Sequence, residues 1–513
     1  MSKWIITWLF LLSLLQPLVG QDPAVVNDSL LVAPAEEPAP RGSIQESEEA
    51  YMRAIQNLLT QPSPEISPDS ILVADVILLG HKRTRSSVIF REMTFGRGDV
   101  IARKDLETTV ARTYNALMNT GLFVSVDISN SDSLLVRGQE IFTLKTRETW
   151  YLYPVPVFSL ADRNFNVWWT EQNRSLDRVN IGAKLTYYNF SGRRDRLKLG
   201  YTTGYTREYE AGYRLPYLNR AGSIGVNIDF NFRQRREQNY ATQFNDQLFY
   251  LDEDNFVYRN TTIDLRGIYR KKIYVSHELS LGYRNERIAD TIAQVLNPEF
   301  FGQGRSSQRF FRIGYTYLND RRDVRNYPWD GYYIEGTLFK EGLGITNERS
   351  GLTAGFTYRK FWGLSDKYSI NVGLAGKYSF IRSQQPFLEN RAIGFGNNGI
   401  VGYQFYVVDG LDMAIWRAGI RRELIKTRLD LGKLAFIPAF RYIPFRLLVA
   451  FQFNQGWANA PFIDETNQLN NRLLTGASLG LDIVLYYDMV GSIQYNRNHL
   501  GEDGVFLALN LNF

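Results

Sequence analysis

The chain has 513 residues, of which 14% are aromatic and 22% charged, with 41 glycines and a formal net charge of +6. Its lack of cysteine excludes disulfides, thiolate nucleophiles and cysteine-ligated metals, and three histidines leave little for a histidine-rich metal centre. The length exceeds one compact soluble domain of roughly 100–200 residues, and the abundance of Tyr, Phe and Gly favours a mainly β protein.

Residues 1–20 have the layout of a secretory signal peptide. Lys3 supplies a positive charge, residues 4–15 form an apolar run, and Pro17 and Gly20 follow. The apolar run is too short to span a bilayer as a helix, which needs about 20 residues. We expect cleavage near residue 21 and export of the mature protein; the alternative is an uncleaved anchor helix.

Residues 21–70 are expected to form a linker without a packed fold. Seven of the 17 prolines lie there, together with nine acidic and two basic residues, which gives a net charge of −7. Such a segment cannot bury enough apolar area to offset the conformational entropy lost on ordering.

Residues 71–149 are predicted to form a small α/β domain. An alternating apolar segment ends at Gly80, and a short helix follows. A second helix has Leu106, Val110 and Leu117 at helical spacing and ends before Gly121. Two further alternating segments complete the order βααββ.

This α/β segment resembles a polypeptide-transport-associated (POTRA) domain. The resemblance rests on the turn at Gly80, on the Val-Ile-Phe-Arg-Glu run that contains Arg91 and Glu92, and on the Thr-Gly-Leu-Phe run that contains Gly121 and Phe123. The available length holds one such domain. The resemblance implies that an edge strand of this domain binds extended client chains by β-augmentation.

A connector is expected at residues 150–178, and a β-barrel at residues 179–513. Apolar residues occupy every second position of successive segments, and at roughly 21 residues per strand and loop the region holds about sixteen strands. A water-soluble sandwich or barrel with an apolar core is the alternative. The opposite faces carry charges such as Asp229, Asp264 and Arg312. A dry core would not accept them unpaired, so we predict a transmembrane antiparallel barrel with apolar side chains toward lipid.

The two ends of this barrel are expected to meet at one seam. We place the first seam strand at residues 179–190, with Val179, Ile181, Ala183 and Leu185 on one face. The last strand ends in Leu509, Leu511 and Phe513 and resembles the C-terminal recognition signal of bacterial outer-membrane barrels. Closure of the barrel removes strand edges, which cannot stay unpaired in hydrocarbon.

The order of domains and several barrel motifs resemble the BamA/TamA superfamily of outer-membrane insertases and translocases. In that family the tip of a long loop folds into the lumen and is held there by an arginine–aspartate pair. Here the corresponding tip is Val401, Gly402 and Tyr403, and the strand residue is Asn454, so both charged partners are neutral. Glu423 matches the family's glutamate on the preceding strand, and Arg421 or Arg422 is its expected partner.

The resemblance implies a non-enzymatic factor, without cofactor or metal, that inserts or translocates proteins at the outer membrane of a Gram-negative cell, with the POTRA domain in the periplasm. Expected partners are outer-membrane lipids, unfolded client proteins and accessory subunits. Basic residues are spread over the chain rather than clustered, so no nucleic acid is expected. The alternatives are an exporter of one dedicated client, as in two-partner secretion, and a passive porin-like channel.

Overall fold

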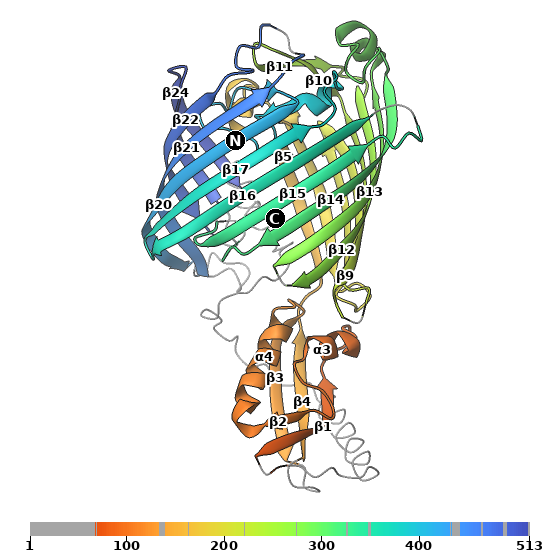
Figure 1. The fold of residues 1–513 in the computed structure, drawn as a ribbon, viewed down its shortest axis with the longest axis vertical. Coiled ribbons are helices and arrows are strands. Elements are labelled where there is room, and N and C mark those ends of the chain that lie inside the picture. Colours follow the sequence, from red (N-terminus) through yellow and green to blue (C-terminus); the bar gives the residue numbers. More distant parts are fainter. Residues whose placement is uncertain are drawn as a thin grey trace.

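The computed structural model describes residues 67, 69–132, 139–162, 164–219, 221–272, 274–324, 327–346, 350–430, 432, 442–462, 465–485 and 490–510. The predicted signal peptide, nearly all of the predicted linker, and Leu511 and Phe513 lie outside the described residues. Two bodies make up the described part, a small α/β domain and a large curved sheet that forms a barrel (Figure 1). We call the end of the barrel beside the small domain the near end and the opposite end the far end.

The N-terminal domain has a four-stranded sheet in the order β2-β1-β4-β3, with β1 parallel to β4. Its core contains Ile89, Leu117, Phe142 and Leu144, each almost fully buried. The predicted order βααββ matches, except for a short extra strand, β2, whose three residues are too few to show a periodicity. The elements are β1 Ser70–Leu79, α3 Ser86–Glu92, β2 Val100–Ala102, η1 Arg103–Asp105, α4 Leu106–Met118, β3 Phe123–Asp132 and β4 Gln139–Glu148.

The barrel sheet has sixteen strands, as predicted, and each described ladder in it is antiparallel. The strands are β5 Leu152–Leu160, β6 Val179–Tyr188, β7 Arg196–Gly204, β8 Thr206–Leu215, β9 Ile224–Arg235, β12 Tyr258–Lys272, β13 Val275–Ile288, β14 Ser307–Asp320, β15 Gly331–Glu341, β16 Gly351–Ser365, β17 Tyr368–Ser379, β20 Asp412–Asp430, β21 Tyr442–Asn459, β22 Leu474–Val484, β23 Val490–Asn498 and β24 Asp503–Asn510.

The alternation of the strands separates an apolar outer face from a charged lumen. On the outer face Ile228 and Leu265 are 47% and 45% exposed. On the inner face Asp264 lies 3.0 Å from Arg284 and 3.6 Å from Arg312. Apolar side chains that point outward and paired charges that point inward are the pattern of a barrel in lipid rather than of one around a dry core.

The prediction that residues 179–190 form the first strand is wrong. β6 is the second strand of the sheet, and β5, inside the predicted connector, is its end strand. β6 is therefore paired on both sides, with β5 and with β7. Its outward-facing residues include Val179, Ile181, Ala183 and Leu185. Two prolines in β5 obscured it in the sequence, because proline is excluded from central strands but tolerated at a sheet edge.

Segments outside the wall cover the far end. The hairpin of β10 (Glu237–Gln243) and β11 (Asp246–Leu251) reaches over the far end of the barrel (Figure 1). Its tip residue Asn245 bonds to Asn467 and Asn470, which follow β21; six strands of the sheet lie between β21 and β12. The hairpin thus spans the opening of the barrel at its far end. The remaining elements are α5 Phe165–Thr170, η2 Leu176–Arg178, η3 Thr291–Leu296, η4 Phe387–Asn390, β18 Arg391–Ile393 and β19 Val408–Asp409.

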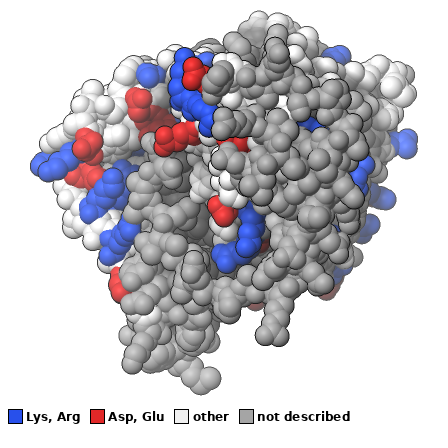
Figure 2. Space-filling model, turned by 90° about the horizontal axis from the view of Figure 1, so that it is seen from below, with Lys and Arg blue, Asp and Glu red and all other residues white. Residues whose placement is uncertain are grey.

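The N-terminal domain contacts turns at the near end of the barrel. The Arg83 Nε donates to the Asn189 carbonyl at 3.0 Å, and the backbone N–H of Arg85 donates to the Gly192 carbonyl at 2.9 Å. Seen from the near end, the described surface carries charges of both signs, interspersed (Figure 2). None of the described helices is long and apolar enough to cross a membrane.

Candidate functional site

The seam between β5 and β24 is the candidate site. These strands end the sheet, and among the described residues no ladder joins them. The backbone of Tyr151 accepts from the Tyr188 N–H, and the Ala161 N–H donates to the Arg178 carbonyl, both at 2.8 Å. Because neighbouring residues of a strand point their backbone groups to opposite sides, the odd-numbered residues of β5 face β6. The even-numbered residues face the seam.

The seam edge of β5 lacks donors. Pro154 and Pro156 are even-numbered and have no N–H, and the ladder to β6 passes both without a break. At Leu152, on the same edge, the carbonyl already accepts a hydrogen bond from the indole Nε1 of Trp150. These features blunt the edge of β5 from residue 150 to residue 156 against pairing with another strand.

The seam edge of β24 is occupied by a side chain. The Asn166 amide donates to the carbonyl of Leu507 and accepts from the N–H of Leu507, both at 3.1 Å. The N–H of Asn498 bonds to the Glu502 carbonyl at the start of this hairpin, so even-numbered residues of β24 face β23 and odd-numbered ones face the seam. Asn166 therefore satisfies both seam-facing groups of one residue in the middle of β24.

Asn166 lies on the short helix α5, in the loop that joins β5 to β6. The helix begins after Asn164, whose side chain accepts a hydrogen bond from the Val167 N–H at 2.9 Å and so caps it. The Asn164 Nδ2 also donates to the Gln404 carbonyl at 3.0 Å. Through these two asparagines α5 contacts both the edge of β24 and the long loop between β17 and β20.

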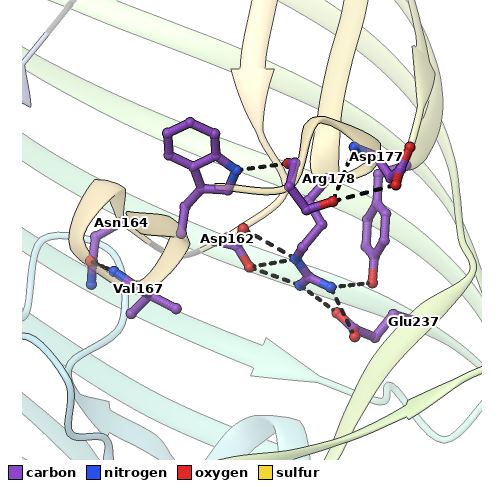
Figure 3. A network of polar contacts seen from close by, with 9 residues as sticks. Asp162, Asn164, Val167, Asp177, Arg178 and Glu237 are labelled. Atoms are coloured by element: carbon purple, nitrogen blue, oxygen red, sulfur yellow. Dashed lines mark hydrogen bonds and ion pairs between the residues drawn. The ribbon is translucent and has the colours of Figure 1, made fainter. Parts of the chain in front are cut away.

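Arg178 fastens the base of the α5 loop. Its guanidinium donates to both carboxylate oxygens of Asp162, at 2.8–3.2 Å, and to Glu237 on β10 at 2.7 and 3.1 Å. It also donates to the hydroxyl of Tyr205 at 2.8 Å. Figure 3 shows the guanidinium between the two carboxylates. The Asp162 and Glu237 side chains are 3% and 11% exposed, so Arg178 compensates two buried negative charges.

The predicted loop tip packs against the inner wall. Tyr403 and Val401 are 2% and 8% exposed. Gly402 has a φ of +83° and its carbonyl accepts from the Asn498 side chain at 2.9 Å. The Tyr403 hydroxyl bonds to the His499 Nδ1, and burial raises the pKa of this tyrosine.

A glycine of the barrel wall leaves room for the backbone of this loop tip. A Cβ placed on Gly476 of β22 would lie 1.9 Å from the Val401 carbonyl oxygen. Backbone and wall are therefore closer than any residue with a side chain would allow.

Asn454 lies beside the tip, whereas Glu423 does not. Asn454 is 3% exposed, and its register partners are Arg417 on β20 and Gly476 on β22. Gly456 of β21 lies against Ile400 of the loop. Glu423 is opposite Leu448, eight residues along β21 from Gly456, which is roughly 26 Å at about 3.3 Å per residue. The expectation that Glu423 is a partner of the loop is therefore wrong.

The expected ion-pair partners of Glu423 also need correction. Its carboxylate accepts from the Nε of Arg446 on β21 at 2.5 Å, not from Arg421 or Arg422. Arg446 sits on the neighbouring strand, and that pairing could not be seen without the register of β20 against β21. Arg421 instead donates to the Pro328 carbonyl at 3.0 Å.

The loop is held by an arginine of the wall. Arg417 Nη2 donates to the carbonyls of Asn397 and Gly399 at 2.9 and 3.0 Å, just before the tip. In the expected family pattern the loop carries the arginine and the barrel strand carries the acceptor. Here the arginine lies on the barrel strand, and the acceptors are backbone carbonyls of the loop. The sequence contained no spacing that singled out Arg417.

Asp409 lines a cavity of about 300 Å³ at the far end, together with Thr242, Asn297, Gln385 and Asn467. Burial raises the pKa of its carboxyl to about 6, although Arg391 and Lys377 act in the opposite direction. A carboxyl whose pKa is higher in the folded chain destabilises the fold above that pKa, and the effect is relieved as the pH falls through about 6.

We expect Asp409→Asn to be more stable than the native chain at about pH 7.5 by on the order of 1 kcal/mol, a value reduced because the carboxyl borders an open cavity. The difference should shrink toward about pH 5, since the native carboxyl is then protonated as well. Urea unfolding of both proteins at the two pH values measures it. If the unfolding free energies of the two proteins changed with pH in the same way, the pKa of Asp409 would not be raised by folding.

The POTRA motif residues lie in two places. Gly80 and Gly121 have φ values of +83° and +70° and end β1 and the turn after α4, and Phe123 begins β3. The Arg91 guanidinium stacks 3.9 Å above the ring of Tyr217, and Glu92 lies 3.7 Å from Arg194.

Tyr217 and Arg194 belong to near-end turns of the barrel, so this half of the motif joins the two bodies rather than lining a free edge. At the other end of the chain, the backbone of Leu509 lies in β24. Within the described ranges no three His, Asp or Glu side chains gather closely enough to hold a metal ion.

Comparison with known proteins indicates the fold. No model of a known protein family matches the chain, and no curated protein matches it. Among solved structures, BamA from Haemophilus ducreyi lacking POTRA domains 1–3 is similar at 15% identity and a TM-score of 0.57, over 85% of this chain and 83% of that one.

Two CdiB structures are also similar, at lower TM-scores. CdiB from Escherichia coli has 12% identity and a TM-score of 0.47, over 92% of this chain and 95% of that one. CdiB from Acinetobacter baumannii has 13% identity and a TM-score of 0.47, over 99% and 96%. The shared fold is established by the comparison with BamA.

Proposed function

Because the chain has the fold of the BamA/TamA superfamily, we propose that it inserts or translocates other proteins at a bacterial outer membrane. The proposal places the barrel in that membrane, the N-terminal domain in the periplasm and the signal peptide at residues 1–20. The substrates are unfolded outer-membrane or exported proteins, and accessory periplasmic or lipoprotein subunits are further candidate partners. The process requires no chemical step and no cofactor.

The observation that carries this proposal is the seam. A strand edge in hydrocarbon costs several kcal/mol, roughly, for each unsatisfied backbone group, so a barrel that only conducts solutes gains nothing from one. Here β5 and β24 share no described ladder, and both edges are blunted by groups of the chain itself. A seam whose described strands are capped by side chains rather than joined by a ladder suits a barrel that opens sideways to a client strand.

The N-terminal domain supports the same function. Its sheet order places the ten-residue strand β3 at an edge, where an extended client could add as a further strand; among the described residues β4 alone pairs with β3. The contacts of Arg83 and Arg91 with near-end turns fix this domain directly below the barrel. An extended client bound along β3 would be held close to the entry of the lumen.

Two alternatives differ in what passes through the barrel. A passive porin-like channel is disfavoured by the buried loop tip at Tyr403 and by the hairpin bridge at Asn245. An exporter of one dedicated client shares the architecture, and it is distinguished by its substrate range.

Reconstitution in lipid vesicles tests the proposed function. We expect vesicles that contain the chain to speed the folding of several unrelated outer-membrane barrel proteins, measured as protease-protected, heat-modifiable client. Depletion from cells should lower many outer-membrane proteins together. Loss of a single secreted protein would favour the dedicated exporter, and small-solute conductance without client folding would favour the channel.

A further inference from the structure

The side chain of Asn166 imitates a paired strand at the edge of β24. Its carboxamide has the donor and acceptor of a peptide group, and it bonds to the N–H and C=O of Leu507 as a neighbouring backbone would. Such two-way pairing by a residue 341 positions away in the chain satisfies an edge that would otherwise be open at this residue. The structure therefore holds a stand-in for a bound strand.

The edge of β5 is unsuited to the same role. A strand added to β5 would find no N–H at Pro154 and Pro156, and the carbonyl of Leu152 is already bonded to Trp150. β24 contains no proline. Its seam-facing residues Asp503, Val505, Leu507 and Leu509 each have a backbone N–H and C=O, of which those of Leu507 are bonded to Asn166. Val505 and Leu507 expose apolar side chains outward.

We propose that β24 is the strand that receives clients, and that Asn166 is a removable cap on its edge. An extended client backbone would replace the Asn166 amide at Leu507 and continue along Val505 and Leu509. One side-chain pair of hydrogen bonds is then exchanged for several main-chain pairs, which favours the client once it is aligned. This inference rests on the proposed function and specifies the receiving edge.

The surrounding contacts allow the cap to move without unfolding its loop. Arg178 holds both ends of the loop through Asp162 and through its own place before β6, and Glu237 anchors it to β10. Asn166, the second residue of α5, makes the hydrogen bonds from this helix to β24. The bond from Asn164 to the Gln404 carbonyl links the cap to the long loop, so that displacement of one loosens the other.

The first experiment measures the cap without a client. Hydrogen exchange of the β24 peptide is compared in the native chain, Asn166→Ala and Leu176→Ala, the last an exposed residue of the same loop. We expect Asn166→Ala to exchange at least several-fold faster near Leu507 and Leu176→Ala to match the native chain. Asn166→Gln, which keeps the amide, should be intermediate. Equal exchange in Asn166→Ala and the native chain would overturn the cap.

The second experiment identifies the receiving edge. A photo-reactive residue replaces Val505 on β24 or Phe158 on β5, two outward side chains, and the vesicle-embedded chain is mixed with an unfolded outer-membrane barrel protein. We expect client adducts at position 505, several-fold more in the Asn166→Ala background, and background levels at position 158.

The outcomes separate this inference from the proposed function. Adducts mainly at position 158 would overturn the assignment of β24 and leave the insertase function standing. Adducts between two copies of the chain would show that the edge serves self-association instead, and would also overturn it. Client folding without adducts at either edge would reject β24 as the receiving strand and the seam as the route.

Discussion

Replacing Gly476 by valine is expected to expel the loop tip from the barrel wall. The position of its Cβ is 1.9 Å from the Val401 carbonyl oxygen, and a backbone atom cannot rotate away as a side chain can. Ordinary overpacking costs about 1–3 kcal/mol, and this collision should reach or exceed the upper value. We expect a lower melting temperature and faster proteolysis between residues 395 and 405, because Tyr403 leaves its buried site.

Gly336→Val is the matched control. Gly336 also lies in a barrel strand, β15, but no atom is found within 4 Å of its Cβ position. This variant should melt and digest like the native chain. Equal effects of the two substitutions would mean that strand glycines as such matter, and that the docking of the loop at Gly476 does not.

Arg178→Met is expected to lower the free energy of unfolding by about 3–5 kcal/mol, because it leaves two buried carboxylates without their cation. Asp162 and Glu237 both bond to this one guanidinium. Arg178→Lys should be only partly tolerated, since an ammonium cannot make the forked contacts. Urea titration of the chain in phospholipid vesicles provides the measurement.

A second substitution distinguishes charge from packing. In the Arg178→Met background, Asp162→Asn removes one stranded charge and should recover part of the lost stability, whereas alone it should destabilise the chain. If the two substitutions are additive, the carboxylate of Asp162 does not depend on Arg178, and the anchor of the α5 loop must lie elsewhere.

Most of the fold could be predicted from the sequence. Strict alternation identified the barrel, since each outward side chain must face lipid and each inward one can carry charge. The strand number followed from the length of the region at roughly 21 residues per strand and loop. The α/β domain followed from helical spacing at Leu106, Val110 and Leu117 and from its turns. β5 was missed because Pro154 and Pro156 break the strand signal in any setting except a sheet edge, and edges are not visible before the topology is known.

The site was less predictable than the fold. The loop tip at Val401, Gly402 and Tyr403 was identified by resemblance, and the structure buries it. Its actual anchors, Arg417 and Asn498, lie on strands β20 and β23 and bond to backbone carbonyls, which no side-chain pattern announces. The role of Asn166 could not be predicted from the sequence either, because it depends on the backbone of a residue 341 positions away.

If clients enter through the seam, the seam must open for clients to fold, and locking it tests this requirement most directly. The chain has no cysteine, so cysteines at positions 166 and 507 would be its only thiols, and a short reducible crosslinker can join them. We predict that crosslinked chain in vesicles stops folding barrel clients and that reduction restores the activity. Undiminished client folding by the fully crosslinked chain would contradict the account.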